Sequence, residues 1–272
     1  MTEPAAIEPL DLRFSEDELA EVVDHLEDFI AARVEAAGTE RVVLGLSGGV
    51  DSSTVAHLAV EALGTEALHG LVLPGSVSDE ENMSDAERVA TELGIEYDVI
   101  EINPFVSRLL DLFPEAEDDY MAVGNARARA RAVINYFVAN HENALVLGTG
   151  NRTEGLIGYF TKYGDGAVDC NPLGILYKQQ VRQVARDLGV PEDVVTKTPT
   201  AGLWAGQTDE DELGIGYDTL DAILALHVDG ELSPGATARI LDLDRETVER
   251  IASMHRRSAH KRSRPPGPDP LF

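Results

Sequence analysis

The chain has 272 residues, of which 43% are hydrophobic and 6% aromatic, a composition that excludes a disordered or fibrous protein. No apolar run reaches membrane-spanning length, and the N-terminus lacks the basic start and apolar stretch of a signal peptide. We therefore expect a cytoplasmic protein with no membrane partner. A single cysteine, Cys170, excludes an intramolecular disulfide and disfavours a cysteine-based zinc site.

The formal net charge of -27 comes from carboxylates spread along the whole chain rather than gathered in one tail. Of the 22 basic residues only four are lysines, which resembles the composition of proteins from salt-accumulating halophiles. At molar salt the Debye length falls to about 3 Å, so self-repulsion on such a surface is largely screened. Without a broad basic stripe to neutralise phosphates, a nucleic-acid partner is disfavoured.

Hydrophobic periodicity, together with the capping residues and glycines that begin and end elements, predicts the following order of elements. Residues 15–38 form an amphipathic helix with Ser15 as its N-cap and Gly38 at its end. Strands are expected at 41–46, 67–74, 96–102 and 144–149, with helices at about 51–63, 79–94, 105–112 and 120–140 between them. Residues 150–176 have little periodicity and are interpreted as an ordered functional loop. Helices resume at residue 178, and two more lie near the C-terminus.

Strands alternating with helices at this spacing predict an α/β fold, a doubly wound, mainly parallel sheet flanked by helices, with C-terminal helical additions. No internal repeat and no flexible linker interrupts the pattern. We therefore predict a single domain over residues 1–272, with a polar leader (1–14) and a proline-rich tail (263–272).

The stretch "GLSGGVDSS" follows the first strand and opens a helix. Glycines allow the backbone to approach a ligand, and the helix N-terminus adds partial positive charge, so the loop suits a phosphate or pyrophosphate. It is neither a Walker A sequence nor G-x-G-x-x-G. Asp51 would repel phosphates unless a divalent cation lay between, which makes it a natural Mg²⁺ ligand. A plain tight turn is the alternative that a lone Ser-Gly-Gly would favour.

The long helix carries "GNARARARAVINYF". At about 100° per residue, Asn125, Arg129 and Tyr136 fall within roughly 40° of one another, while Arg127 and Arg131 point to the other side. The first face suits a nucleotide or a ring bearing a carboxylate. For Arg127 and Arg131 we expect a solvated stripe paired with acids.

The segment "LGTGNRTEGLIGYFTKYGDGAVDC" begins with the fourth strand, whose end should reach the same sheet edge as the glycine loop. That geometry brings Thr149 and Glu154 to the loop, and Glu154 is a candidate for the second carboxylate on Mg²⁺. Lys162 and Asp169 flank a glycine-rich turn, and Lys178 begins the next helix.

The loop "SGGVDSS" resembles the pyrophosphate loop of the N-type ATP pyrophosphatases, which implies an adenine nucleotide alpha-hydrolase-like fold. Together with "GYFTKYGDGAVD", "LYKQQV", "KTPTAGLWAGQTDEDELG" and "HKR", in this order, the chain resembles the ammonia-dependent NAD synthetases. The resemblance implies ATP-dependent amidation of deamido-NAD to NAD through a NAD-adenylate, releasing AMP and pyrophosphate. It also implies Mg²⁺ as cofactor, ATP as co-substrate and a homodimer with the dinucleotide near the subunit interface.

The resemblance assigns site residues as follows. Asp51 and Glu154 bind the metal and, with Lys178 and Asp169, act in catalysis. The ATP-binding residues are Gly45, Leu46, Ser47, Gly48, Gly49, Val50, Asp51, Ser52, Thr149, Lys178 and Thr200. Those that contact deamido-NAD are Arg129, Lys162, Asp169, His260 and Lys261, to which the helix-face argument adds Asn125 and Tyr136.

Two alternatives remain open. One is another N-type pyrophosphatase, such as a GMP synthetase subunit or a tRNA-thiolating enzyme, against which the "GYFTKYGDG" block and the scarcity of basic surface argue. The other is a noncatalytic nucleotide-binding module of the stress-protein kind, which would not need both Asp51 and Glu154. Free ammonia is the expected nitrogen donor, because the chain has no room for an amidase domain and no second cysteine. Residues 203–214 resemble a loop that closes over the reacting groups, or are solvated surface.

Overall fold

The computed structural model describes residues 10–75, 80–200 and 208–268. In chain order its strands and helices are α1 Glu16–Ala37, β1 Arg41–Leu46, α2 Val50–Leu63, β2 Leu68–Val72, α3 Glu80–Leu93, β3 Glu96–Val99, α4 Asn103–Leu112, α5 Tyr120–Glu142, β4 Ala144–Leu147, α6 Arg152–Ile157, α7 Lys178–Asp187, α8 Glu192–Thr196, α9 Asp209–Leu213, α10 Tyr217–Leu224, α11 Pro234–Leu241 and α12 Arg245–Arg257. α10 continues into a π-helical turn, Ala225–Asp229.

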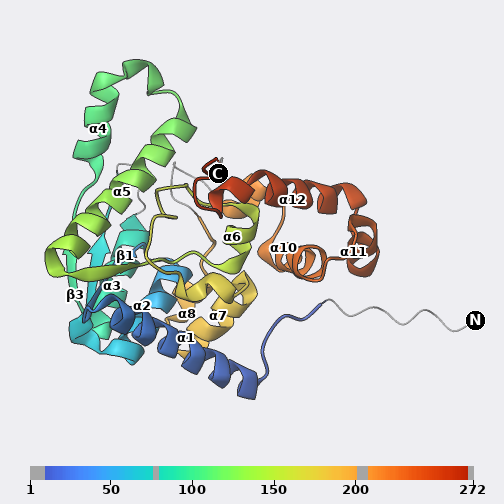
Figure 1. Cartoon of the computed structure of the whole chain (residues 1–272), viewed down its shortest axis with the longest axis horizontal. Coiled ribbons are helices and arrows are strands. Elements are labelled where there is room, and N and C mark those ends of the chain that lie inside the picture. Colours follow the sequence, from blue (N-terminus) through green and yellow to red (C-terminus); the bar gives the residue numbers. More distant parts are fainter. Residues whose placement is uncertain (1–9, 76–79, 201–207, 269–272) are drawn as a thin grey trace, which may run out of the picture.

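The four strands form one parallel sheet in the order β3-β2-β1-β4. Alternate side chains of β1 point to opposite faces, as strand geometry requires. Val42 and Leu44 join the core cluster formed with α1, α2, α7 and α8, whereas Val43 packs in a second cluster with α5. Helices thus cover both faces of the sheet (Figure 1), which confirms the predicted doubly wound arrangement.

The first helix begins and ends as predicted. Ser15 forms a capping box with Glu18, and Gly38 ends the helix with φ +68°. The interpretation of residues 150–176 as loop throughout is wrong at α6, which spans six residues. The sequence signal for α6 was the capping box of Asn151 and Glu154, because a helix of six residues is too short to show helical periodicity.

The C-terminal helices α10, α11 and α12 build a third core cluster that also covers α6. Its largest buried side chain is Tyr217, packed with Leu220 and Ile251. These helices lie to one side of the sheet (Figure 1), which confirms the predicted C-terminal additions. They matter for function because α6 and α7, held between this layer and the sheet, begin at the candidate site.

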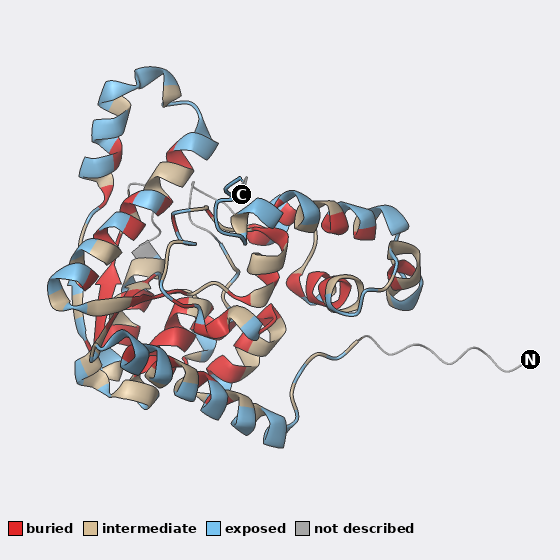
Figure 2. Ribbon diagram, viewed as in Figure 1, coloured by how far each residue is buried: buried red, intermediate tan, exposed pale blue. Residues whose placement is uncertain are grey.

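At the other side, α4 and the first half of α5 extend from the body as a helical hairpin (Figure 1). Most of this hairpin is exposed (Figure 2). Among the residues that the structure describes, no helix is long and apolar enough to cross a membrane.

Candidate active site

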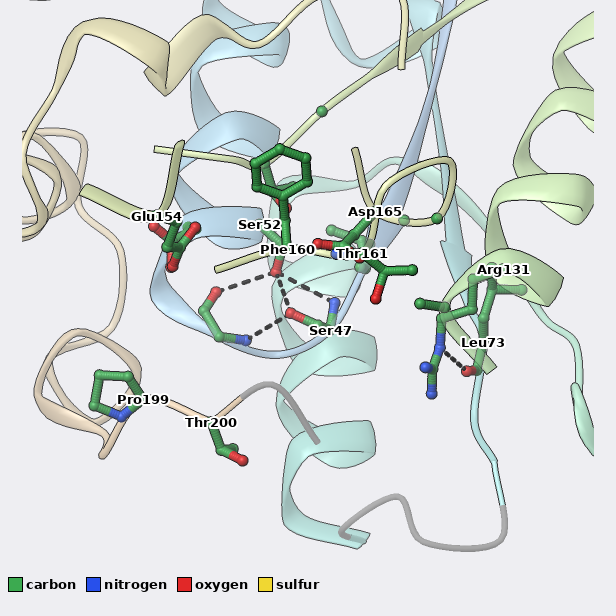
Figure 3. A pocket seen from close by; sticks show the side chains of 18 of the residues that line it. Ser47, Ser52, Leu73, Arg131, Glu154, Phe160, Thr161, Asp165, Pro199 and Thr200 are labelled. Atoms are coloured by element: carbon green, nitrogen blue, oxygen red, sulfur yellow. Dashed lines mark hydrogen bonds between the residues drawn. The ribbon is translucent and has the colours of Figure 1, made fainter. Parts of the chain in front are cut away.

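A pocket of about 540 Å³ opens at the carboxyl edge of the sheet, where β1, β2 and β4 end. Parallel α/β folds bind ligands at this edge, because the strand-to-helix loops converge there. The pocket is lined by the glycine loop after β1, by α3 and α5, by residues 147–168, and by Lys178, Thr200 and Asp209 (Figure 3). Of the predicted ATP-binding residues, all but Gly48 line it.

The glycine loop is held in shape by its own hydroxyls (Figure 3). Ser52 is buried and its Oγ accepts a hydrogen bond from the Ser47 backbone N–H at 3.2 Å while donating to the Gly49 carbonyl at 3.1 Å. The Ser47 and Ser52 hydroxyls lie 3.0 Å apart. Helix α2 starts immediately after, with Gly49 as N-cap. A preformed loop at a helix N-terminus can hold phosphate without further ordering.

Gly48 adopts φ +74°, and a Cβ there would lie well inside van der Waals contact with the Asn82 carbonyl. We expect Gly48→Ala to weaken ATP binding at least about tenfold and to destabilise the fold by about 1–3 kcal/mol. Gly38→Ala is the matched control, because Gly38 also has positive φ but has open space around it. Calorimetric titration with ATP should show normal binding for the control, and equal binding by both variants would contradict the prediction.

Asp51, Glu154 and Lys178 line the pocket and contact one another. The Lys178 side chain is 3% exposed and its Nζ forms a short ion pair with Asp51 and a longer one, 3.4 Å, with Glu154. Asn151 contacts both acids: its Nδ2 donates to Asp51 at 2.8 Å, and its backbone N–H donates to the Glu154 carboxylate at 3.4 Å. Carboxylates from α2 and α6 thus meet the ammonium group of Lys178.

Burial and charge set the protonation of this group of residues. Burial raises the pKa of Glu154 despite the opposing effect of Lys178. Burial also opposes the charged form of Lys178, but the carboxylates of Asp51 and Glu154 prevail and raise its pKa. The lysine therefore stays cationic at neutral pH, beside the loop that suits phosphates.

The donor atoms fit Mg²⁺ bound jointly with phosphate. Two carboxylates, Asp51 and Glu154, face one point beside the glycine loop, and Mg²⁺ usually takes one or two carboxylates with the rest of its ligands from phosphate and water. Over the described ranges, no group of three or more His, Cys, Asp or Glu side chains could hold a metal by itself. A site completed by the nucleotide is consistent with both facts.

The predicted face of α5 does not act as a unit. Asn125 lines the pocket and accepts a hydrogen bond from Thr161, but Arg129 is exposed and donates to the Lys162 carbonyl at 3.2 Å. Arg131 lines the pocket instead and donates from Nε to the Leu73 carbonyl at 3.0 Å (Figure 3). The expectation of a solvated Arg131 is therefore wrong, since burial lowers the pKa of its guanidinium.

Tyr136 and Asp169 form a pair just outside the residues that line the pocket. The Tyr136 hydroxyl donates to Asp169 at 3.0 Å, and the other carboxylate oxygen accepts from the Val146 N–H at 2.8 Å. Burial, reinforced by Asp169, raises the pKa of Tyr136 to about 12. The pair ties α5 to the end of β4, and its predicted substrate contacts stay a prediction.

A second pocket of about 320 Å³ is lined by Lys162 and Lys261, together with Arg262, Arg264 and two aromatic rings. His260 is not among the residues that line it. Lys162 Nζ donates to the His260 carbonyl at 2.6 Å, so His260 contributes its backbone rather than its ring. Lys261 Nζ donates to the Gly158 and Phe160 carbonyls and also lines the main pocket. Four cations side by side suit an anionic part of a ligand.

Sequence reasoning missed a group of buried side chains behind Lys178. Tyr217 places its ring 5.1 Å from Lys178 Nζ and donates its hydroxyl to Asp209 at 2.8 Å. Asp209, 4% exposed, also accepts from Tyr159 at 3.1 Å. Tyr159 follows α6, Asp209 begins α9 and Tyr217 begins α10, and an acid inside a run such as "DEDEL" carries no sign of burial. Of the predicted closing segment, 203–207 lie outside the described residues, and 208–214 contain α9.

Comparison with known proteins gives a consistent result. The NAD synthase family model matches residues 22–265. The chain is 65% identical over 268 residues to a Halobacterium salinarum protein named NH3-dependent NAD+ synthetase, covering 98% of this chain and all of that protein. A solved NMN synthetase from Francisella tularensis is 36% identical with a TM-score of 0.81, covering 95% of this chain and 100% of the other. An NH3-dependent NAD synthetase from Campylobacter jejuni is 31% identical with a TM-score of 0.74, covering 92% and 99%.

Proposed function

Because the chain belongs to the NAD synthase family, we infer that it is an ammonia-dependent ligase that amidates deamido-NAD to NAD at the expense of ATP. The observation that carries this function in the molecule is the meeting of Lys178 with two carboxylates beside the preformed glycine loop. That arrangement can bind the phosphates of ATP and neutralise charge that develops on them.

The chemical difficulty is that a carboxylate resists attack by ammonia. Transfer of AMP from ATP to the nicotinate carboxylate forms a mixed anhydride, the NAD-adenylate, and releases pyrophosphate. Ammonia then displaces AMP and leaves the amide. The reaction requires no nucleophile from the protein, so its rate depends on positioning and on electrostatic stabilisation.

In this reaction Lys178 holds a fixed positive charge where the α-phosphate passes through its transition state. Asp51 and Glu154 would hold Mg²⁺, which when bound supplies further positive charge for the phosphates. Asn151 donates hydrogen bonds to both carboxylates, from its side-chain amide to Asp51 and from its backbone to Glu154, and Ser47 and Ser52 shape the loop that receives the triphosphate. The group formed by Lys162, Lys261, Arg262 and Arg264 is suited to the phosphates of the dinucleotide.

The nitrogen donor follows from what the chain offers. Hydrolysis of glutamine by an amidase needs a reactive thiolate, whereas Cys170 is buried, and burial raises the pKa of its thiol to about 11. Cys170 thus serves as a packing residue at the edge of the sheet. Free ammonia is the donor that fits this chain.

The reaction is tested by mass spectrometry of products in molar KCl with deamido-NAD, ATP and Mg²⁺. Ammonium and glutamine are supplied in separate reactions. NAD and AMP should appear with ammonium and not with glutamine. The likeness to an NMN synthetase names a second candidate product, so a third reaction supplies nicotinate mononucleotide and ammonium. Absence of AMP and pyrophosphate under all conditions would favour the noncatalytic nucleotide-binding module instead.

We also propose that the chain acts as a cytoplasmic homodimer, for which the hairpin of α4 and α5 offers the contact surface. Helices α4 and α5 and the residues next to α4 expose large apolar side chains, which on the hairpin are Phe105, Leu109, Leu112, Phe113, Tyr120 and Met121, and on the second half of α5 are Val133 and Phe137. Their exposed fractions reach 73% at Phe137, and apolar patches of this extent usually mark interfaces.

Phe137→Asp should convert the dimer to a monomer, because a charge buried in an apolar interface is desolvated and unpaired. Sedimentation in molar KCl measures the change. Ile240→Asp, at another exposed apolar position on α11, is the control and should stay dimeric. A wild-type chain that sediments as a monomer at all concentrations would contradict the proposal.

A further inference from the structure

Asp221 is a carboxylic acid with no exposed surface, inside the C-terminal helical layer. Its Oδ1 accepts a hydrogen bond from the Thr153 hydroxyl at 2.5 Å, and its Oδ2 accepts one from the Gln179 N–H at 3.0 Å. Both donors lie next to reacting groups, because Thr153 precedes Glu154 and Gln179 follows Lys178. The proposed chemistry gives Asp221 no contact with substrate.

The first backbone N–H groups of α7 have no partners inside the helix and must find them elsewhere. The Tyr177 N–H donates to Gln180 within the helix itself. The Lys178 N–H donates to the Thr153 hydroxyl at 3.0 Å, and the Gln179 N–H donates to Asp221. Helix α7 is therefore capped by side chains from α6 and α10 rather than by its own N-cap residue.

The hydrogen bonds form one chain that joins three elements. Thr153 accepts from Lys178 N–H and donates to Asp221, while Asp221 accepts from Gln179, so α6 and α7 are fastened to the same carboxylate. The negative charge of an ionised carboxylate at the N-terminus of α7 also interacts favourably with the helix dipole. A displacement of α7 by the loss of this anchor would move Lys178 relative to Glu154.

We propose that Asp221 is a positioning residue that sets the distance between Lys178 and the carboxylates by capping α7 from α10 and holding Thr153 of α6. The proposal rests on the proposed function, in which Lys178 and Glu154 face the reacting phosphate. Misplacement of a catalytic group by about 1 Å can cost about 10²-fold in rate.

The energetic state of Asp221 supports a role beyond stability. Burial raises the pKa of Asp221 to about 6, although the hydrogen bonds from Thr153 and α7 oppose the rise. The folded-state pKa thus lies above the unfolded value, so the ionisation of Asp221 lowers the stability of the fold as the pH rises from the unfolded value to about 6. A neutral or apolar side chain would avoid this cost, yet it would lose one or both of the hydrogen bonds.

The test compares Asp221→Asn with Asp218→Asn, a control on the same helix whose side chain is 78% exposed. In the NAD-forming assay, Asp221→Asn should lower kcat about 10- to 100-fold and change KM for ATP by less than about threefold. The control should match the wild type. Amide exchange of the peptide that contains residues 177–181 supplies a readout independent of activity, and its protection should fall in Asp221→Asn only.

Thr153 keeps the proposal testable if Asp221→Asn does not fold. Thr153→Ser retains the hydroxyl and should retain kcat within about threefold, whereas Thr153→Val should show the same kcat loss as Asp221→Asn. Unchanged kcat and unchanged exchange in folded Asp221→Asn, or equal losses in the Ser and Val variants, would overturn the proposal. If the wild type forms no NAD, the proposed function fails, and the exchange comparison still decides whether Asp221 anchors α7.

Discussion

Replacing Lys178 with methionine is expected to reduce kcat for NAD formation about 10³-fold, the upper range for removing one preorganised charge from a transition state. Methionine keeps the length and apolar stem of lysine but removes the ammonium that contacts Asp51 and Glu154. Rapid-quench measurement of AMP transfer isolates this step from product release. Arg182→Met, one turn further along α7, is the control and should keep kcat within about threefold.

The same substitution should also destabilise the free protein. Without Lys178, the carboxylates of Asp51 and Glu154, 18% and 19% exposed, face each other uncompensated, which costs about 3 kcal/mol of unfolding free energy. The charge of Asp51 adds to burial in raising the pKa of Glu154, so this loss should shrink as the pH falls and Glu154 takes up a proton. Urea unfolding at two pH values measures it. A Lys178→Met chain of wild-type activity would exclude the electrostatic role.

Asp51→Asn and Glu154→Gln are each expected to reduce kcat by about 10³-fold while ATP binding falls much less. The reason is that each carboxylate both pairs with Lys178 and offers an oxygen to a divalent cation, whereas the loop at Ser47 and Ser52 stays intact. Calorimetric titration of ATP and the product assay are run on the same preparations. Glu192→Gln, an exposed acid paired with Arg186, is the control.

This experiment also separates the two classes of function. A nucleotide-binding module would lose little when either carboxylate is neutralised, because it has no turnover to lose. Full activity of both variants in the presence of Mg²⁺ would contradict the metal-binding proposal for Asp51 and Glu154. Loss of activity in only one of them would assign the cation to that residue.

Local patterns predicted most of the framework because their causes are local. The apolar run 41–46 and the cap residues Ser15 and Gly38 specify a strand and a helix from neighbours in the chain. The convergence of the glycine loop with Glu154 was also foreseeable, since parallel strands bring their carboxyl ends to one edge. Beyond that edge, short elements such as α6 lacked the length for periodicity to reveal them.

The choice between Arg129 and Arg131 shows where local reasoning stops. Alternating arginines on a helix define two faces, but nothing in the repeat says which of them packs toward the sheet. The structure turns Arg131 to the pocket because Ala130 and Ile134 pack against β1 and β4, which leaves Arg129 exposed beside Lys162. A better signal was the set of apolar residues on α5, which marks the buried face.

By itself the sequence determined the alternating α/β order, the glycine loop that suits phosphate and the candidates Asp51 and Glu154, since each depends on neighbouring residues or on the rule that joins parallel strands, while Lys178 became a candidate through the resemblance to a family. Only the tertiary structure decided that Lys178 lies between both carboxylates, that Asn151 donates hydrogen bonds to them, and that Asp221 caps α7 from another layer. The reason is that burial and hydrogen-bond partners arise from contacts between distant positions, such as Lys178 and Asp51, which are 127 positions apart, and no local pattern contains them.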